Sequence, residues 1–215
     1  MNRDIIKSTE DFVKEQLSGV ESGHDWWHIQ RVRNLAMHIY SIEQNGDPIV
    51  IELASLLHDV GDDKIASEVN GTILVGSFLT KEGIDRDIKE KVFHIMENIS
   101  FRDSFNGSCI RTAELNIVQD ADRLDAIGAI GIARAFNYGG SAGNAIYEPG
   151  NGPREYRSKD EYTGSDSSTI NHFYEKLLKL KDIMNTETGK RLAEERHEFM
   201  LSFLAQFYSE WNAGE

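Results

Sequence analysis

Residues 49–60, IVIELASLLHDV, organise the fold of this chain, because nearly every position is apolar until the stretch ends in a histidine and an aspartate. A helix that is apolar on nearly all sides is predicted to lie buried at the centre of a domain. Asp47 and Pro48 precede it, and these residue types cap a helix start and occupy its first turn. An ionised group next to a core must be paired or hold a metal. The stretch therefore predicts a buried helix that leads into a functional site.

Apolar residues recur at helical spacing along most of the rest of the chain. Further helices are predicted over residues 4–18, 25–43, 66–80, 84–98, 110–137, 167–183 and 187–212. Gly61 is placed to end the central helix. Asn70-Gly71, before TILV, leaves a hairpin turn open as an alternative to helix there. The predicted fold class is all-α.

A glycine-rich segment interrupts the helical pattern over residues 137–166. It holds six glycines and two prolines and shows no apolar stripe. A long irregular loop inside a compact domain is usually functional or disordered. At 215 residues we expect a single domain over 1–215, with a core at about 20–135, this loop, and C-terminal helices at about 167–212.

Composition and charge exclude several classes of function. The net charge of −13 repels a phosphate backbone, so we expect no binding to long nucleic acid. Cys109 is the single cysteine, so an internal disulfide is impossible and a reducing, cytoplasmic location is expected. No apolar run approaches the length of a membrane span, and the N-terminus lacks the apolar core of a signal peptide, so no membrane partner is expected. Small phosphorylated substrates and a homodimer are left open.

Histidines lie before the central helix and at its end. His24 and His28 are four residues apart and share a helical face, with Arg31 one turn further along. His58 and Asp59 close the central helix, where the macrodipole favours a cation. A lone surface histidine is more often structural than functional, so the prediction depends on further ligands.

A third element, NIVQDADRLD at residues 116–125, adds Asp120, Asp122 and Asp125. Asp122 and Asp125 are three residues apart and fall roughly on one helical face. Two imidazoles and two carboxylates suit a divalent ion with positions left open for water. The absence of a cysteine cluster makes a closed structural zinc site an unsuitable alternative.

The order of His28, His58-Asp59 and an aspartate within ADRLD resembles the H…HD…D signature of the HD-domain metal-dependent phosphohydrolases. The resemblance covers about residues 20–135. Residues 168–196, STINHFYEKLLKLKDIMNTETGKRLAEER, are similar to a small bacterial branch of that superfamily, in which some members are nucleotide pyrophosphohydrolases. The resemblance to this superfamily implies an HD-domain helical bundle with a C-terminal helical extension. The implied metal ligands are His28, His58, Asp59 and Asp122, with Asp120 as an alternative to Asp122.

The same resemblance implies a cofactor and a catalytic segment. Only His94 offers another imidazole between His58-Asp59 and the last aspartate, so we expect one divalent ion, Mn²⁺ or Mg²⁺, with Co, Fe, Ni or Zn as alternatives. Residues 58–63, HDVGDD, resemble the HDxxED form of HD enzymes that hydrolyse alarmone pyrophosphate. Asp62 or Asp63 could orient or deprotonate the attacking water, or could only cap the next helix. Lys64 could contact a phosphate or be solvated.

Basic and polar side chains elsewhere are candidates for substrate binding. The candidates are His24, Arg31, His94, Arg123, His172 and Lys176. The arginines could hold phosphate through two hydrogen bonds, although Arg123 could equally pair with an acid. His94 could instead be a hydrogen-bonded interior histidine, and His172 with Lys176 could be a solvated helical face.

These features predict an enzyme that acts on a small phosphorylated substrate. The resemblance favours hydrolysis of a nucleotide, with release of pyrophosphate from a nucleoside or deoxynucleoside triphosphate. A nucleotide phosphomonoesterase or phosphodiesterase is the enzymatic alternative. The alternative of another class is a non-catalytic HD domain that senses nucleotides. Such domains usually lack one or more metal ligands, and all four candidates are present here.

Overall fold

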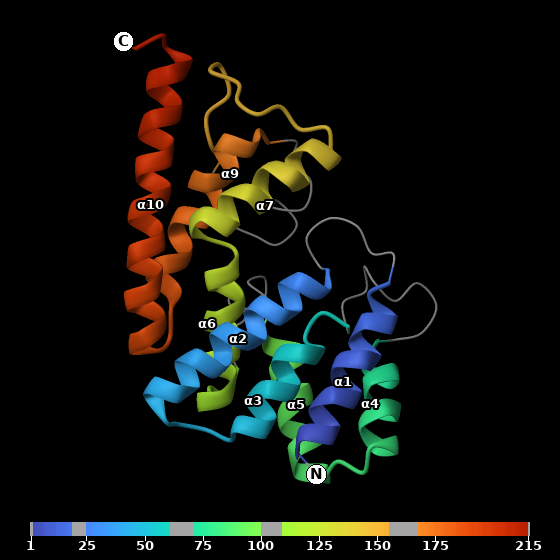
Figure 1. Ribbon diagram of the computed structural model, residues 1–215. Coiled ribbons are helices and arrows are strands. Elements are labelled where there is room, and N and C mark those ends of the chain that lie inside the picture. The colour runs from blue at the N-terminus through green and yellow to red at the C-terminus, as the bar shows by residue number, and fades with distance from the viewer. Residues whose placement is uncertain (1, 19–24, 61–70, 100–108, 155–166, 215) are drawn as a thin grey trace. The chain divides into compact units, whose positions relative to one another are not determined.

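The computed structural model describes residues 2–18, 25–60, 71–99, 109–154 and 167–214, and every regular element in these ranges is a helix (Figure 1). The elements are α1 (Asn2–Gln16), α2 (Trp26–Glu43), α3 (Pro48–Leu57), α4 (Gly71–Lys81), α5 (Arg86–Asn98), α6 (Ala113–Asp125), α7 (Gly128–Ser141), α9 (Thr169–Glu175), the 3-10 helix η2 (Leu177–Ile183) and α10 (Glu187–Trp211). The all-α prediction is confirmed. None of these helices is long and apolar enough to cross a membrane.

The chain forms two compact units, Met1–Asp122 and Arg123–Glu215, and the boundary falls inside α6. In the first unit, α1, α2 and α5 pack around α3. In the second, α10 packs against α7 and η2, and α9 packs against η2 and α7. The expectation of one domain over the whole chain stays a prediction.

Helix α3 is the buried centre of the first unit, as its sequence predicts. Ile51, Leu53 and Ala54 point in different directions around this helix, and all three are fully buried. Asp47 caps its start by accepting a hydrogen bond from the Ile49 amide at 3.0 Å, and Pro48 occupies the first position. The regular helix ends at Leu57, and Gly61, predicted to terminate it, lies outside the described residues.

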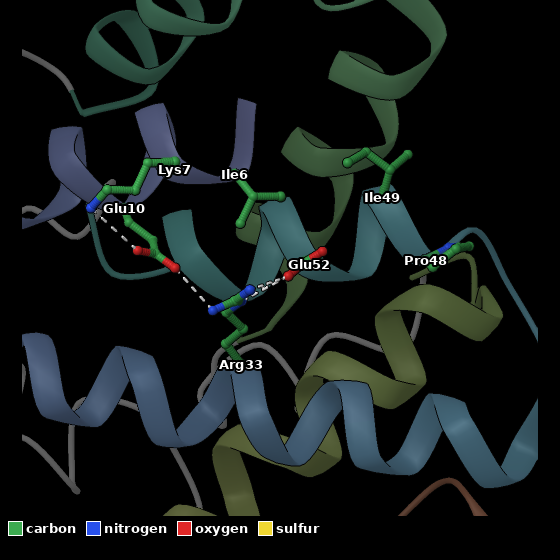
Figure 2. Close-up of a pocket in the computed structure, with 7 residues that line it drawn as sticks. All are labelled: Ile6, Lys7, Glu10, Arg33, Pro48, Ile49 and Glu52. Carbon is green, nitrogen blue, oxygen red and sulfur yellow. Dashed lines mark hydrogen bonds and ion pairs between the residues drawn. The ribbon is translucent and has the colours of Figure 1, made fainter. Parts of the chain in front are cut away.

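An ion-pair network holds α1 and α3 against α2 (Figure 2). Arg33 on α2 donates to Glu10 of α1 at 3.0 Å and to Glu52 of α3 at 2.8 Å. All three side chains are less than one quarter exposed. Because the network is only partly solvated, its charges are screened less than those of a surface ion pair would be. The network therefore helps to place α3, the helix that His58 and Asp59 follow.

The single helix predicted over residues 110–137 is wrong, since the structure has a corner between α6 and α7. Ile127 is extended, with φ −127° and ψ 168°, and Gly128 has φ +75°. A glycine takes this left-handed conformation at little cost, so the chain turns here. Helix α7 then continues to Ser141, so Gly139 and Gly140, assigned to the irregular loop by the sequence, are helical.

Two other boundaries differ from the predictions. Gly71 begins helix α4, so the alternative of a hairpin turn is wrong at Gly71. Asn70, the other residue of that turn, lies outside the described residues. The helix predicted over 167–183 is divided into α9 and η2, because Lys176 leaves the helical region with φ −136° and ψ −58°. Apolar periodicity continues through both kinds of helix, so it could not reveal the division.

A buried carboxylate fastens the described ends of the glycine-rich segment within the second unit. Glu175, which is 6% exposed, accepts hydrogen bonds from the Arg154 amide at 3.0 Å and the Ser167 hydroxyl at 2.9 Å. Asn171, one turn earlier on α9, donates to the Asn151 carbonyl at 2.8 Å. These bonds hold residues 151–154 and Ser167 close to α9.

Candidate metal centre

Three elements of the first unit bring four predicted ligands together. His28 lies in the first turn of α2, His58 and Asp59 directly follow α3, and Asp122 lies in the last turn of α6. His28, His58 and Asp59 are all buried, at 1%, 6% and 8% exposure, and each offers a ligand atom within 4.8 Å of the others. Asp122 approaches the same two imidazoles from α6.

An aspartate that caps α2 places His28. The Asp25 carboxylate accepts a hydrogen bond from the His28 amide at 2.9 Å, and Asp25 itself has the extended backbone of an N-cap. The start of the helix is therefore fixed three residues before the ligand, and its buried face carries the His28 ring inward.

The end of α3 orients His58. Because the helix stops at Leu57, the Ser55 carbonyl is among the last carbonyls, which have no partner within the helix. It lies 2.9 Å from His58 Nδ1, so that nitrogen carries the proton and donates it. The Nε2 atom is then left with its lone pair toward the cluster, which is the tautomer that a metal ligand needs.

The spacing of the ligand atoms fits one metal ion. The two Nε2 atoms of His28 and His58 lie 3.3 Å apart. Asp59 lies between them, with one oxygen 3.4 Å from His28 Nε2 and the other 3.4 Å from His58 Nε2. Two atoms that bind one ion at about 2.0 to 2.2 Å, with bonds about 90° to 110° apart, are about 3 to 3.5 Å from each other. The observed spacing matches this range.

Asp122 completes a set of two nitrogen and two oxygen donors. Its Oδ1 lies 3.5 Å from His28 Nε2 and 4.0 Å from His58 Nε2, and its side chain is 33% exposed. Asp120 is fully buried and stays the alternative ligand. Asp125 is used elsewhere, since its carboxylate pairs with Arg134 at 2.7 Å. Mixed imidazole and carboxylate donors suit first-row divalent ions and tolerate Mg²⁺.

Three residues predicted to contact substrate lie on α2, α5 and α6. Arg31 is partly buried on α2, one turn after His28. His94 on α5 is hydrogen-bonded through Nε2 to the Ile110 carbonyl at 2.8 Å. Arg123 is 5% exposed and donates to the Ile183 carbonyl of η2. His94 and Arg123 therefore have structural contacts, and their roles in substrate binding stay predictions.

His172 and Lys176 belong to the second unit, on and just after α9. Burial of the His172 ring lowers its pKa to about 4, and the positive charge of Lys176 adds to the shift. The imidazole is therefore neutral near neutral pH and cannot provide a positive charge there. Any role of His172 in binding an anion would have to use a neutral N–H donor.

The remaining predicted residues, His24, Asp62, Asp63 and Lys64, lie outside the described part of the chain. Asp25 and Ser55 are the positioning residues that sequence reasoning missed. An aspartate directly before an apolar helical pattern is an N-cap signal, and Asp25, which precedes Trp26, could have been identified by it. The role of the Ser55 carbonyl depends on where α3 ends, which the apolar pattern does not specify.

Comparisons with known proteins identify the family and the relatives of this chain. The family model described as HD domain matches residues 26–127. YpgQ of Bacillus subtilis, an uncharacterized protein, is 41% identical over 91% of this chain and 88% of YpgQ.

Three solved structures resemble the fold over nearly the whole chain. A Lactobacillus plantarum protein has a TM-score of 0.86 at 38% identity, covering 98% of each chain. An HD-superfamily hydrolase from Bacillus thuringiensis has a TM-score of 0.79 at 42% identity, covering 99% of this chain and 100% of that one. YpgQ in complex with ADP has a TM-score of 0.76 at 39% identity, with coverage of 95% and 97%.

Proposed function

Because the chain belongs to the HD superfamily and is a metal-dependent phosphohydrolase, we propose that its substrate is a nucleotide and that it releases pyrophosphate from a nucleoside or deoxynucleoside triphosphate. The observation that carries the proposal is the cluster of His28, His58, Asp59 and Asp122, whose atoms are spaced as ligands of one ion. The complex of Bacillus subtilis YpgQ with ADP supports a nucleotide as the class of substrate.

The proposed reaction adds water to a phosphorus atom and breaks one phosphoanhydride bond. A divalent ion, Mn²⁺ or Mg²⁺, supplies charge neutralisation for phosphoryl oxygens and makes water more acidic when it is bound. The residues of this chain fix the donors: Ser55 holds the tautomer of His58, and Asp25 holds the backbone of His28. Asp122 is the most exposed of the four proposed ligands, so substrate in this proposal reaches the ion from the side of Asp122.

A general base completes the proposal. Asp62, with Asp63 as its alternative, takes a proton from the attacking water, and Lys64 contacts a phosphate. Arg31, one turn from His28 on α2, is the arginine that we propose holds phosphate. The test for Asp62 is Asp62→Asn, which should lower turnover while Mn²⁺ binding is retained. An unchanged turnover would leave Asp62 with only the role of capping the next helix.

The products of a nucleotide panel decide between the candidate functions. Metal-stripped protein is supplied with Mn²⁺ or Mg²⁺ and each nucleoside and deoxynucleoside triphosphate, diphosphate and monophosphate. Phosphorus NMR then resolves the products. Pyrophosphate with a monophosphate supports the proposal, whereas orthophosphate released from a monophosphate, with the free nucleoside as the other product, supports a phosphomonoesterase. Binding without any product supports a nucleotide sensor.

A further inference from the structure

Asp122 lies in the last turn of α6, where a helix is least stable. It is followed by only three residues of that helix, which ends at Asp125. The last four carbonyls of an α-helix have no intrahelical N–H to bind. Here the chain closes on a tight turn in which the Ile127 amide donates to the Leu124 carbonyl at 3.2 Å. Support from outside α6 adds to the few hydrogen bonds that hold this turn.

Two arginines supply that support. Arg196 on α10 donates a hydrogen bond from Nη1 to the backbone carbonyl of Leu124, and Leu124 lies two residues after Asp122. Arg134 on α7 donates to the Asp125 carbonyl at 3.2 Å and to the Asp125 carboxylate at 2.7 Å. Positive charge at the C-terminal end of a helix is also favourable to the helix dipole. The last turn is therefore held by hydrogen bonds and by charge.

The side chain of Arg196 is built into the corner that ends α6. A Cβ atom on Gly128 would lie 2.9 Å from Arg196 Cγ and 3.1 Å from its Cβ, so the glycine leaves the space that the arginine stem fills. Burial lowers the pKa of Arg196, while the charge of Asp125 opposes this shift. An arginine stays protonated in proteins, so a charged, directional donor is held in a partly buried position.

We infer that Arg196 is a positioning residue for the metal, because it holds the turn of α6 that carries Asp122. The inference rests on the proposed function, since it requires Asp122 to be a ligand. Without this donor the last turn of α6 loosens from its C-terminal end, and the Asp122 carboxylate spends less time beside the two imidazoles. Metal affinity then falls although Arg196 contacts no metal. Outer residues that orient ligands typically contribute about 10- to 100-fold in metal affinity.

A double-mutant cycle on metal affinity tests the inference. Calorimetric titration of metal-stripped protein with Mn²⁺ gives the dissociation constant for the wild type, Arg196→Met, Asp122→Asn and the double variant. Arg191→Met is the control, because Arg191 lies on the same helix in an exposed ion pair with Glu195. Arg196→Lys is run in parallel as a second variant, since it keeps the charge and one donor. Circular dichroism checks that each protein is folded.

The expected result is a loss of Mn²⁺ affinity of at least about tenfold for Arg196→Met, and of less than about twofold when Asp122 is already Asn. Arg191→Met should leave the affinity unchanged. An equal loss in both backgrounds, or no loss with Asp122 intact, would overturn the role of Arg196 and leave the proposed function standing. Unchanged affinity in Asp122→Asn would instead refute the ligand assignment and, with it, this inference.

Discussion

Burial of His172 predicts that this protein loses stability in mild acid. The pKa of His172 falls from 6.5 to about 4 because its ring is desolvated in the second unit, with Lys176 nearby. The folded state therefore resists protonation, whereas the unfolded chain binds a proton below its ordinary pKa. The contribution of His172 to the free energy of unfolding is fully present above about pH 6.5 and is lost as the pH falls toward about 4. A shift of about 2.5 units corresponds to about 3 kcal/mol.

The perturbation that isolates this effect is His172→Gln, which removes the titrating ring. Urea unfolding of metal-stripped protein, followed by circular dichroism at several pH values between 7.5 and 4.5, gives the free energy of unfolding. Other groups titrate equally in both proteins, so the difference between them reports His172. We expect wild type to lose stability relative to His172→Gln by roughly 2 to 3 kcal/mol as the pH falls. His38→Gln, at an exposed position on α2, is the control. Parallel curves for wild type and His172→Gln would refute the lowered pKa of His172.

Three further predictions concern the site and the corner of α6. His58→Ala should abolish Mn²⁺ retention and hydrolysis together with little loss of helical content, measured by titration, product assay and circular dichroism; full activity would contradict the site. Asp25→Ala should weaken Mn²⁺ binding by loosening the first turn of α2, and Asp25→Ser, which can still cap, should recover most of it; equal weakening in both would remove the cap as the cause. Gly128→Ala should destabilise the protein by about 1 to 3 kcal/mol more than Gly143→Ala, because both glycines have similar positive φ but only at Gly128 would the added Cβ clash with Arg196. Equal losses in urea unfolding would show that backbone strain alone matters.

Much of the fold follows from local patterns in the sequence. Apolar residues recur every three to four positions along a helix that packs on a core. From this spacing α2, α3 and α5 were predicted within a few residues of their observed bounds. The corner after α6 was not predicted, because apolar positions continue through it at helical spacing. Gly128 carried the signal, but a glycine within a helical pattern does not by itself show whether the chain turns.

The sequence by itself determined the all-α class, because helical periodicity is a local property, and its resemblance to the HD-domain family supplied the candidate ligands, with Asp120 left open beside Asp122. Tertiary structure decided which side chains meet: Asp122 reaches the imidazoles, while Asp125 pairs with Arg134. It also decided how the ligands are held, through the Ser55 carbonyl and the donors at the end of α6. These outcomes depend on where helices end and how they pack. Distances between residues far apart in the chain are set by packing, and no local pattern records them.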